Sequence, residues 1–257
     1  MALNEIKEDN IFGRFFYSQT YITLKNFLFN YLLRKRMVEK YSRPYYKKAI
    51  KSQDYLIIDI GSGISPITPV PEKTLFIDIE KEAIEFLRKN NFSAQEGDIN
   101  SLKIKNNSTD LIFCSEVLEH LPDYNSALKE LSRILKPKGH LIITVPTHDY
   151  YWKDDDEFVG HFRRFNPNDL KKDIQKSGLE LLQIKPIGNW LERNLSWLAI
   201  RIAKPNISAM SNNKELGIIK KTSFRIVNLI LFYLVLSTYF LNSVNRASVI
   251  LFVATKN

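Results

Sequence analysis

The sequence predicts an α/β fold in which a doubly wound, mostly parallel sheet of seven strands carries helices on both faces. Short apolar runs alternate with segments of helical periodicity from residue 55 to residue 184, as expected of strands joined by crossover helices. The first run ends in a glycine turn, which is typical of a buried parallel strand. The chain has 257 residues, of which 44% are hydrophobic, so it suffices for one sizeable core.

The sheet is expected to use seven apolar runs of the chain. Helical spacing occurs between them: Leu128, Leu131 and Ile134 form one stripe. Asn166 before Pro167 is a favourable start for another helix. In chain order the expected strands are residues 55–60, 75–79, 92–95, 110–114, 141–145, 179–184 and 247–254.

The first crossover departs from this alternation. Gly63 is followed by Pro66, Pro69 and Pro71. Proline inside an ordinary helix removes a backbone hydrogen bond and clashes with the preceding turn. We therefore expect a loop or a single turn between the first two strands.

Two apolar appendages accompany the sheet. Residues 1–53 are expected to form an N-terminal helical cap, and residues 54–257 the main domain, with an apolar helical insertion at about 188–243 before the last strand. Within the insertion, the apolar stretch 226–241 is shorter than the roughly 20 residues of a membrane span. Burial against the core or shallow insertion into a membrane interface fits it better, and the same holds for residues 12–33.

Charge is unevenly distributed along the chain. The formal net charge is +9, with basic flanks around an acidic middle. Basic flanks suit an anionic membrane surface, nucleic acid or an anionic substrate, or they are lysines on solvated helix faces. The single cysteine, Cys114, excludes an internal disulfide and favours a cytoplasmic location, and the first ten residues do not look like a secretory signal. We expect a cytoplasmic protein, with peripheral contact at the inner membrane surface as an alternative.

Polar residues follow three successive expected strands. Asp59, Gly61 and Gly63 lie in the turn DIGSG, where the glycines let a ligand approach the backbone and the carboxylate can accept a hydrogen bond from an ammonium group. Asp78 ends the next strand, where it can accept hydrogen bonds from both hydroxyls of a ribose. Asp98 follows the third strand and can approach an adenine amino group. Together they predict a nucleoside site at the carboxyl ends of the strands.

The segment DLIFCSEVLEHL at residues 110–121 and the segment LSRILKPKGHLIITVP at residues 131–146 complete a recognisable set. With them, the chain from about residue 55 to residue 184 resembles the class I, Rossmann-like S-adenosylmethionine-dependent methyltransferases, in particular the small-molecule, type 11-like branch. The resemblance implies S-adenosylmethionine as the cofactor. The cofactor-binding residues that it implies are Asp59, Gly61, Ser62, Gly63, Asp78, Ile79, Asp98, Ile99, Ser115, Glu116 and Val117.

Methyl transfer from a sulfonium needs alignment of the two reactants and, for some acceptors, removal of a proton. Three histidines near the expected site, His120, His148 and His161, are the candidate bases; surface or capping roles remain alternatives. Arg163 and Arg164 are candidate substrate-binding residues that can grip a carboxylate or phosphate, or they are solvated loop charges.

The acidic run at residues 154–157 is expected to be an exposed loop, and no metal site is predicted. No Asn-Pro-Pro-Tyr motif follows the fourth strand, so a nucleic acid substrate is not favoured. The apolar appendages suggest a lid over a small or lipid-like methyl acceptor. The alternatives are a nucleotide-dependent oxidoreductase on a similar sheet and a non-catalytic, membrane-associated binding protein. The sequence does not indicate an oligomeric state.

Overall fold

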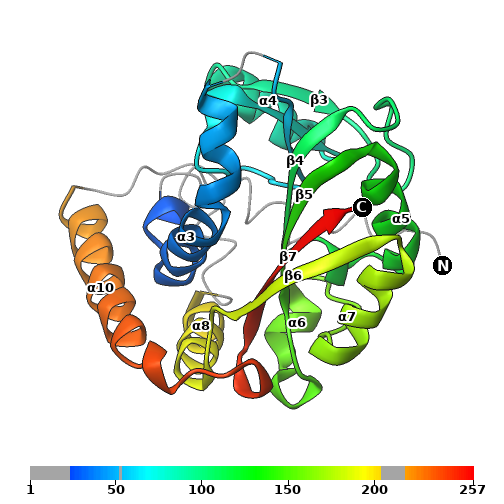
Figure 1. Ribbon diagram of the computed structural model, residues 1–257. Helices are drawn as coiled ribbons and strands as arrows, with labels where there is room; N and C mark the ends of the chain where they lie inside the picture. The colour runs from blue at the N-terminus through cyan, green and yellow to red at the C-terminus, as the bar shows by residue number, and fades with distance from the viewer. Residues whose placement is uncertain (1–23, 52–53, 204–217) are drawn as a thin grey trace.

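The computed structural model describes residues 24–51, 54–203 and 218–257. Its centre is a seven-stranded sheet with the order β3-β2-β1-β4-β5-β7-β6 (Figure 1). All neighbouring strands run parallel except β7, which runs antiparallel to both β5 and β6. The strands are β1 Ile57–Ile60, β2 Thr74–Asp78, β3 Ser93–Glu96, β4 Thr109–Ser115, β5 Leu135–Pro146, β6 Leu179–Pro186 and β7 Val249–Lys256. The predicted fold class is confirmed.

One face of the sheet is covered by α5 (Tyr124–Ile134) and α7 (Pro167–Lys176). The stripe predicted on α5 is fully buried against the strands. The Asp123 side chain caps α5 by accepting hydrogen bonds from two backbone N–H groups, and the Asn166 side chain caps α7 by accepting one from the Asn168 N–H. These two helices form the layer on this face of the sheet.

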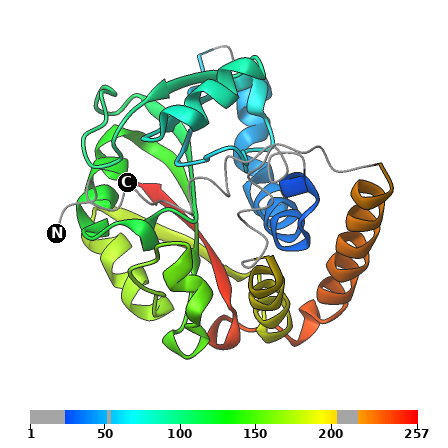
Figure 2. The ribbon, with the colours of Figure 1, turned by 180° about the vertical axis from the view of Figure 1, so that it is seen from behind.

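The other face is covered by α3 (Phe29–Lys51), with α8 (Trp190–Ala203) and α10 (Ile218–Ser237) beyond it (Figures 1 and 2). α3 buries Leu33 and Val38 against Phe113 and other strand residues. α8 and α10 lie between β6 and β7 along the chain. The N-terminal segment therefore packs on the sheet beside a helical pair from the far end of the chain.

The crossover between β1 and β2 contains no α-helix. Every residue between the two strands is described, and the segment forms a loop that ends in the single 3-10 turn η2 (Pro71–Lys73). Ile67 and Val70 of this loop are buried in the same cluster as α3. The predicted prolyl loop is confirmed, and α3 packs over this region of the sheet.

The acidic run at residues 154–157 was expected to be an exposed loop, and this prediction is wrong. The run forms the short helix α6 (Asp154–Phe158) with Asp155 and Asp156 buried. Within the described ranges, further short helices are η1 Lys25–Phe27, α4 Lys81–Lys89, η3 Leu118–His120, η4 Asp149–Tyr151, η6 Tyr239–Leu241 and η7 Val244–Arg246.

Part of the apolar stretch at residues 12–33 lies outside the described residues, and so does most of the predicted cap before α3. Within the described ranges, no helix combines the length and the apolar content that crossing a membrane requires. The domain boundaries at residues 53 and 54 stay a prediction.

Candidate cofactor and acceptor site

Asp59 is the last polar side chain of β1 and is completely buried. Its Oδ2 accepts hydrogen bonds from the backbone N–H groups of Ile67 and Thr68, each at 3.3 Å, so the prolyl loop closes over it. Oδ1 has no hydrogen-bond partner among the described residues. Burial raises the pKa of Asp59 to about 7. Its second oxygen is thus available to a cationic ligand group.

The glycines of the turn adopt a backbone that favours glycine. Gly61 and Gly63 have φ angles of 69° and 54°. A Cβ at Gly61 would lie 2.6 Å from Cγ2 of Val117, whereas one at Gly63 would meet nothing within 4 Å. Gly61 therefore allows the segment after β4 to approach the turn after β1.

Asp78 links this turn to the end of β2. Its Oδ2 accepts a hydrogen bond from the Gly63 N–H at 2.8 Å, and its Oδ1 accepts one from the Glu80 N–H at 3.0 Å. Burial raises the pKa of Asp78 from its ordinary value. The next residue, Ile79, is 61% exposed. The Asp78 carboxylate can therefore accept hydrogen bonds from a ribose, and the exposed Ile79 side chain can pack against the face of a base.

Asp98 and Ile99 follow β3 at the outer end of this row. Asp98 is exposed, and its Oδ1 accepts a hydrogen bond from the Asn100 N–H at 2.8 Å. Ile99 is buried in the core. The structure therefore leaves the Asp98 carboxylate accessible, and Ile99 could contact a ligand here chiefly through its backbone.

A cavity of about 280 Å³ opens beside the turn after β1. Six of the predicted cofactor residues line it, while Asp78, Ile79, Asp98, Ile99 and Val117 are not among its lining residues. The N-terminal segment closes the cavity on the other side through Lys25, Tyr31 and Arg34. The predicted residues in its lining are Asp59, Gly61, Ser62, Gly63, Ser115 and Glu116.

Glu116 follows β4 with a positive φ of 56°. Its Oε2 lies 2.8 Å from Nη1 of Arg34 in α3, and its Oε1 accepts a hydrogen bond from Oγ1 of Thr144 at 3.0 Å. Thr144 also lies 2.7 Å from the Ser115 hydroxyl. These contacts hold the end of β4 to the N-terminal helix.

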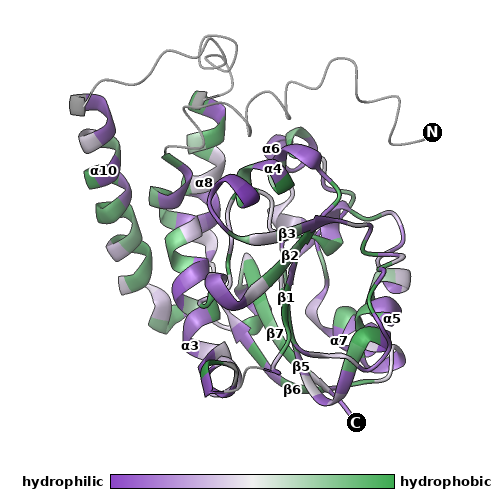
Figure 3. Cartoon of the chain, turned by 90° about the horizontal axis from the view of Figure 1, so that it is seen from above, coloured by the Kyte–Doolittle hydropathy of each residue, from purple (hydrophilic) through white to green (hydrophobic). Residues whose placement is uncertain are grey.

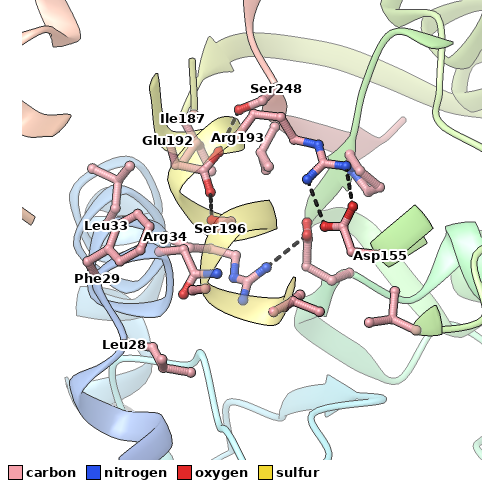
Figure 4. Close-up of a pocket in the computed structure, with 18 of the residues that line it drawn as sticks. Leu28, Phe29, Leu33, Arg34, Asp155, Ile187, Glu192, Arg193, Ser196 and Ser248 are labelled. Carbon is pink, nitrogen blue, oxygen red and sulfur yellow. Dashed lines mark hydrogen bonds and ion pairs between the residues drawn. The ribbon is translucent and has the colours of Figure 1, made fainter. Parts of the chain in front are cut away.

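Figure 4 shows a second cavity, which has a volume of about 390 Å³ and shares several lining residues with the first. Arg34 and Glu116 line both cavities, so the ion pair between them stands where the cavities meet. One wall is apolar and comes from the start of α3, from the β6–β7 region and from the helical insertion. It includes Leu28, Phe29, Leu33, Ile187, Ala199 and Val249.

The opposite wall of the larger cavity is a buried network of charges. Arg193 of α8 donates two hydrogen bonds to Asp155, at 2.7 and 2.6 Å, and one to Asp156 at 2.8 Å. Arg164 also pairs with Asp156 at 2.8 Å. Burial alone would raise the pKa of Asp156, but hydrogen bonds from His161 and Arg164 outweigh it and the net shift is downward. The network fixes α6 and α8 together beside the cavity.

The structure separates the predicted catalytic and substrate residues into two groups. His120, His161 and Arg164 line the larger cavity. His148 does not: its Nε2 lies 3.1 Å from the carbonyl oxygen of Val244 and its ring stacks on Tyr150. Arg163 also lies outside, donating to the carbonyl oxygen of Pro122 with its guanidinium over the ring of Tyr124. Their catalytic and substrate-binding roles stay predictions.

Glu119 is a buried residue that the sequence analysis did not single out. Its side chain is fully buried, and neither carboxylate oxygen has a hydrogen-bond partner among the described residues. Burial and the nearby Glu116 raise its pKa well above the usual value. Burial also lowers the pKa of His120, its neighbour in η3, to about 4.

Lys25 is a second residue that the sequence did not reveal. It is 2% exposed, lines both cavities, and places Nζ 4.3 Å from the centre of the Phe86 ring. Burial lowers its pKa to about 7. Its position depends on packing between segments distant in the chain, so no local pattern marks it.

Residues 58–143 match a family model described as a methyltransferase domain. An uncharacterised protein of Methanocaldococcus jannaschii is 31% identical over 140 residues, which cover 53% of this chain and 60% of that protein. An uncharacterised methyltransferase of Bacillus subtilis is 28% identical over 43% of this chain and 48% of its own length. The chain therefore spans about half the length of these curated relatives.

Solved structures agree on the fold. A SAM-dependent methyltransferase from Archaeoglobus fulgidus superimposes with a TM-score of 0.57 at 18% identity, covering 88% of this chain and 94% of that one. Phosphoethanolamine N-methyltransferase 2 of Haemonchus contortus, solved with S-adenosyl-L-methionine, has a TM-score of 0.51 at 17% identity, covering 84% and 52%. With the sheet order and the matched motifs, the family match makes residues 58–143 similar to the methyltransferase domains of class I, S-adenosylmethionine-dependent enzymes, and the solved structures share the fold.

Proposed function

We propose that this protein transfers a methyl group from S-adenosylmethionine to an acceptor bound in the 390 Å³ cavity. The observation that carries the proposal is the junction of the two cavities at Arg34 and Glu116. One cavity adjoins the residues that suit a nucleoside and an amino acid moiety. The other has room for a second molecule next to it.

The residues of the smaller cavity suit S-adenosylmethionine by their chemistry. The unpartnered Oδ1 of Asp59 would accept a hydrogen bond from the ammonium group of the cofactor. Asp78 would receive the ribose hydroxyls, and Ile79 and Asp98 would flank the adenine. The cofactor has no phosphate, so it does not need the helix N-terminus that the prolyl loop replaces. This argues against the oxidoreductase alternative.

The reaction requires an in-line approach of the acceptor to the methyl carbon. In the proposed arrangement the turn at residues 61–63 and the segment after β4 position the sulfonium. The apolar wall of the larger cavity excludes water and holds the acceptor against it. The Arg34–Glu116 pair limits how far either molecule can move along the junction.

The acceptor is, in our proposal, a lipid-like molecule with an apolar body. Support comes from the apolar wall formed by the N-terminal and inserted helices and from the apolar residues of α10 (green in Figure 3), several of which are exposed to solvent. Lys220, Lys221 and Arg225 lie near the N-terminal end of the same helix. Apolar side chains beside basic ones suit the interface of an anionic membrane. Among the α10 residues whose side chains the structure describes, the most exposed apolar ones are Ile226, Val227, Ile230 and Tyr233.

A labelled-methyl assay tests the activity and the acceptor class together. The full chain and cofactor labelled in the methyl group are incubated with a cell extract, and the label is then partitioned between organic and aqueous phases. We expect protein-dependent label in the organic phase. Label in the aqueous phase alone contradicts the lipid-like acceptor, and no protein-dependent label in either phase contradicts the activity.

Flotation with anionic liposomes tests peripheral membrane contact separately. We expect the full chain to float at low salt and to be released at high salt, because the basic residues act through screened charge. The variant Ile230→Glu should lose flotation. Leu182→Glu, at an exposed apolar site on β6, is the matched control and should float normally. Failure of the wild-type chain to float contradicts a peripheral location.

A further inference from the structure

Three potential metal ligands meet at the edge of the larger cavity. Glu119 and His120 lie in η3, and His161 follows α6. One ligand atom from each lies within 4.8 Å of the ligand atoms of the other two. Two short elements from distant parts of the chain thus bring two imidazoles and a carboxylate to one point.

The two imidazoles are oriented as metal ligands usually are. Nδ1 of His161 lies 2.8 Å from Oδ1 of Asp156, and its Nε2 points to the opposite side, 3.9 Å from Oε1 of Glu119. Nδ1 of His120 lies 3.2 Å from the carbonyl oxygen of Gly160. An acceptor at Nδ1 places the proton there and leaves the Nε2 lone pair free to bind a metal. Both histidines therefore present Nε2 lone pairs.

The carboxylate of Glu119 gives an independent indication of a bound cation. It is fully buried, and neither oxygen has a hydrogen-bond partner among the residues described. Native proteins rarely bury a carboxyl group in this way unless it is paired or bound to a metal. The nearest imidazole nitrogen, Nε2 of His161, faces it without a hydrogen bond. A cation between them would satisfy both groups.

We propose that Glu119, His120 and His161 bind one divalent transition-metal ion, with open coordination positions toward the acceptor cavity. His120 and His161 both line that cavity. Two imidazoles with one carboxylate form a donor set suited to Zn²⁺ and its neighbours rather than to Mg²⁺ or Ca²⁺. Ligand atoms around such an ion lie about 3.4 Å apart, so small side-chain rotations would close the site.

The ion assigns a class to the acceptor, an inference that rests on the proposed methyl transfer. An acceptor hydroxyl at an open position would lose its proton to solvent more readily, because the metal stabilises the resulting oxyanion. That oxygen forms a bond to the methyl carbon while the carbon–sulfur bond breaks. The bonding electrons stay on sulfur as neutral S-adenosylhomocysteine. The products are the methyl ether, S-adenosylhomocysteine and one proton. Because the metal would activate a hydroxyl group in this way, the proposed acceptor is a hydroxyl compound.

Metal binding is measurable without any methyl transfer. The full chain, free of affinity tags, is treated with a chelator, dialysed and titrated with Zn²⁺ by calorimetry. Co²⁺ then serves as a spectroscopic probe of nitrogen and oxygen ligands. We expect one equivalent of Zn²⁺ to bind, Mg²⁺ to bind at least tenfold more weakly, and Zn²⁺ to raise the unfolding temperature. Glu119→Gln and His120→Gln should each weaken Zn²⁺ binding at least tenfold.

His140→Gln is the matched control, since His140 stacks on Tyr45 away from both cavities, and it should bind Zn²⁺ normally. Glu119→Gln keeps the shape of the side chain, so the variant is expected to fold normally. Circular dichroism checks this. The proposal is overturned if the wild-type chain does not bind Zn²⁺, or if all the variants bind it as tightly as the wild-type chain does. Titration of the same chelated protein with S-adenosylhomocysteine separates the two claims: normal binding of this ligand without Zn²⁺ binding rejects the metal site alone.

Discussion

Nη1 of Arg34 lies 2.8 Å from Oε2 of Glu116, and the two side chains line both cavities of the site. Arg34 comes from α3 and Glu116 follows β4, so one ion pair joins the N-terminal helix to the central sheet. The N-terminal segment is therefore part of the candidate site as well as part of the core.

Replacing Arg34 by methionine tests this role. The variant leaves Glu116 without its cationic partner between the two bound molecules, so we expect kcat/KM for methyl transfer to fall about tenfold or more. Arg36→Met, an exposed position on the same helix, is the control and should keep the wild-type value. Equal activity in the two variants would show that the pair has no part in the reaction.

Gly61 and Gly63 form a matched pair for the turn. Both have positive φ, so alanine at either position costs about 1–2 kcal/mol of stability. Only at Gly61 would the new Cβ also lie 2.6 Å from Val117. We expect Gly61→Ala to lower the free energy of unfolding more than Gly63→Ala, and the added change Val117→Ala to recover part of the difference. Urea unfolding of the three variants measures this, and equal losses would reject the steric argument.

Asp59 predicts a pH dependence of stability. Its pKa in the folded chain is about 7, above its ordinary value of 3.8 because of burial. Between these values the folded chain holds a proton that the unfolded chain has lost, so the free energy of unfolding falls as pH rises from about 4 to 7. The side chain of Asp59→Asn does not titrate in this range, so the variant lacks this contribution to the pH dependence. The difference between variant and wild type should grow by more than about 1 kcal/mol from pH 5 to pH 7.5. Parallel curves of stability against pH would contradict the assignment.

Arg193 is expected to contribute most to the stability of the buried charge network beside the larger cavity. Arg193→Met would leave Asp155 and Asp156 buried with fewer cationic partners, so we expect a loss of about 3–5 kcal/mol in chemical denaturation. Lys172→Met removes an exposed pair with Asp169 and should change stability little. A small effect of Arg193→Met would show that the network is not important for folding.

The sheet and the cofactor turn were predictable because their signals are local. Buried strands are short apolar runs, and the carboxyl ends of parallel strands must meet at one edge, so Asp59 and Asp78 could be placed together from spacing alone. The missing crossover helix followed from the prolines after Gly63. These features need no knowledge of long-range packing.

The buried charge network of the larger cavity was not predictable, because the residues that pair in it are distant in the chain. Asp155 and Asp156 look like solvated charges in sequence, yet Arg193, 38 and 37 residues further on, pairs with both. Lys25 lies in an amphipathic segment whose packing the sequence does not specify. His148 follows the carboxyl end of β5, as expected. Its backbone φ of 62° and the contact of its ring with the Val244 carbonyl oxygen nevertheless direct the side chain away from the larger cavity.

Calorimetric titration of the full chain with S-adenosylhomocysteine, with NAD as the comparison ligand, tests the central claim most directly. We expect one equivalent of S-adenosylhomocysteine to bind and NAD to give no heat. Asp78→Asn should weaken binding by about tenfold to a hundredfold, because it removes a charged hydrogen-bond acceptor of the ribose. Binding of NAD, or no binding of S-adenosylhomocysteine by the folded wild-type chain, would contradict the account.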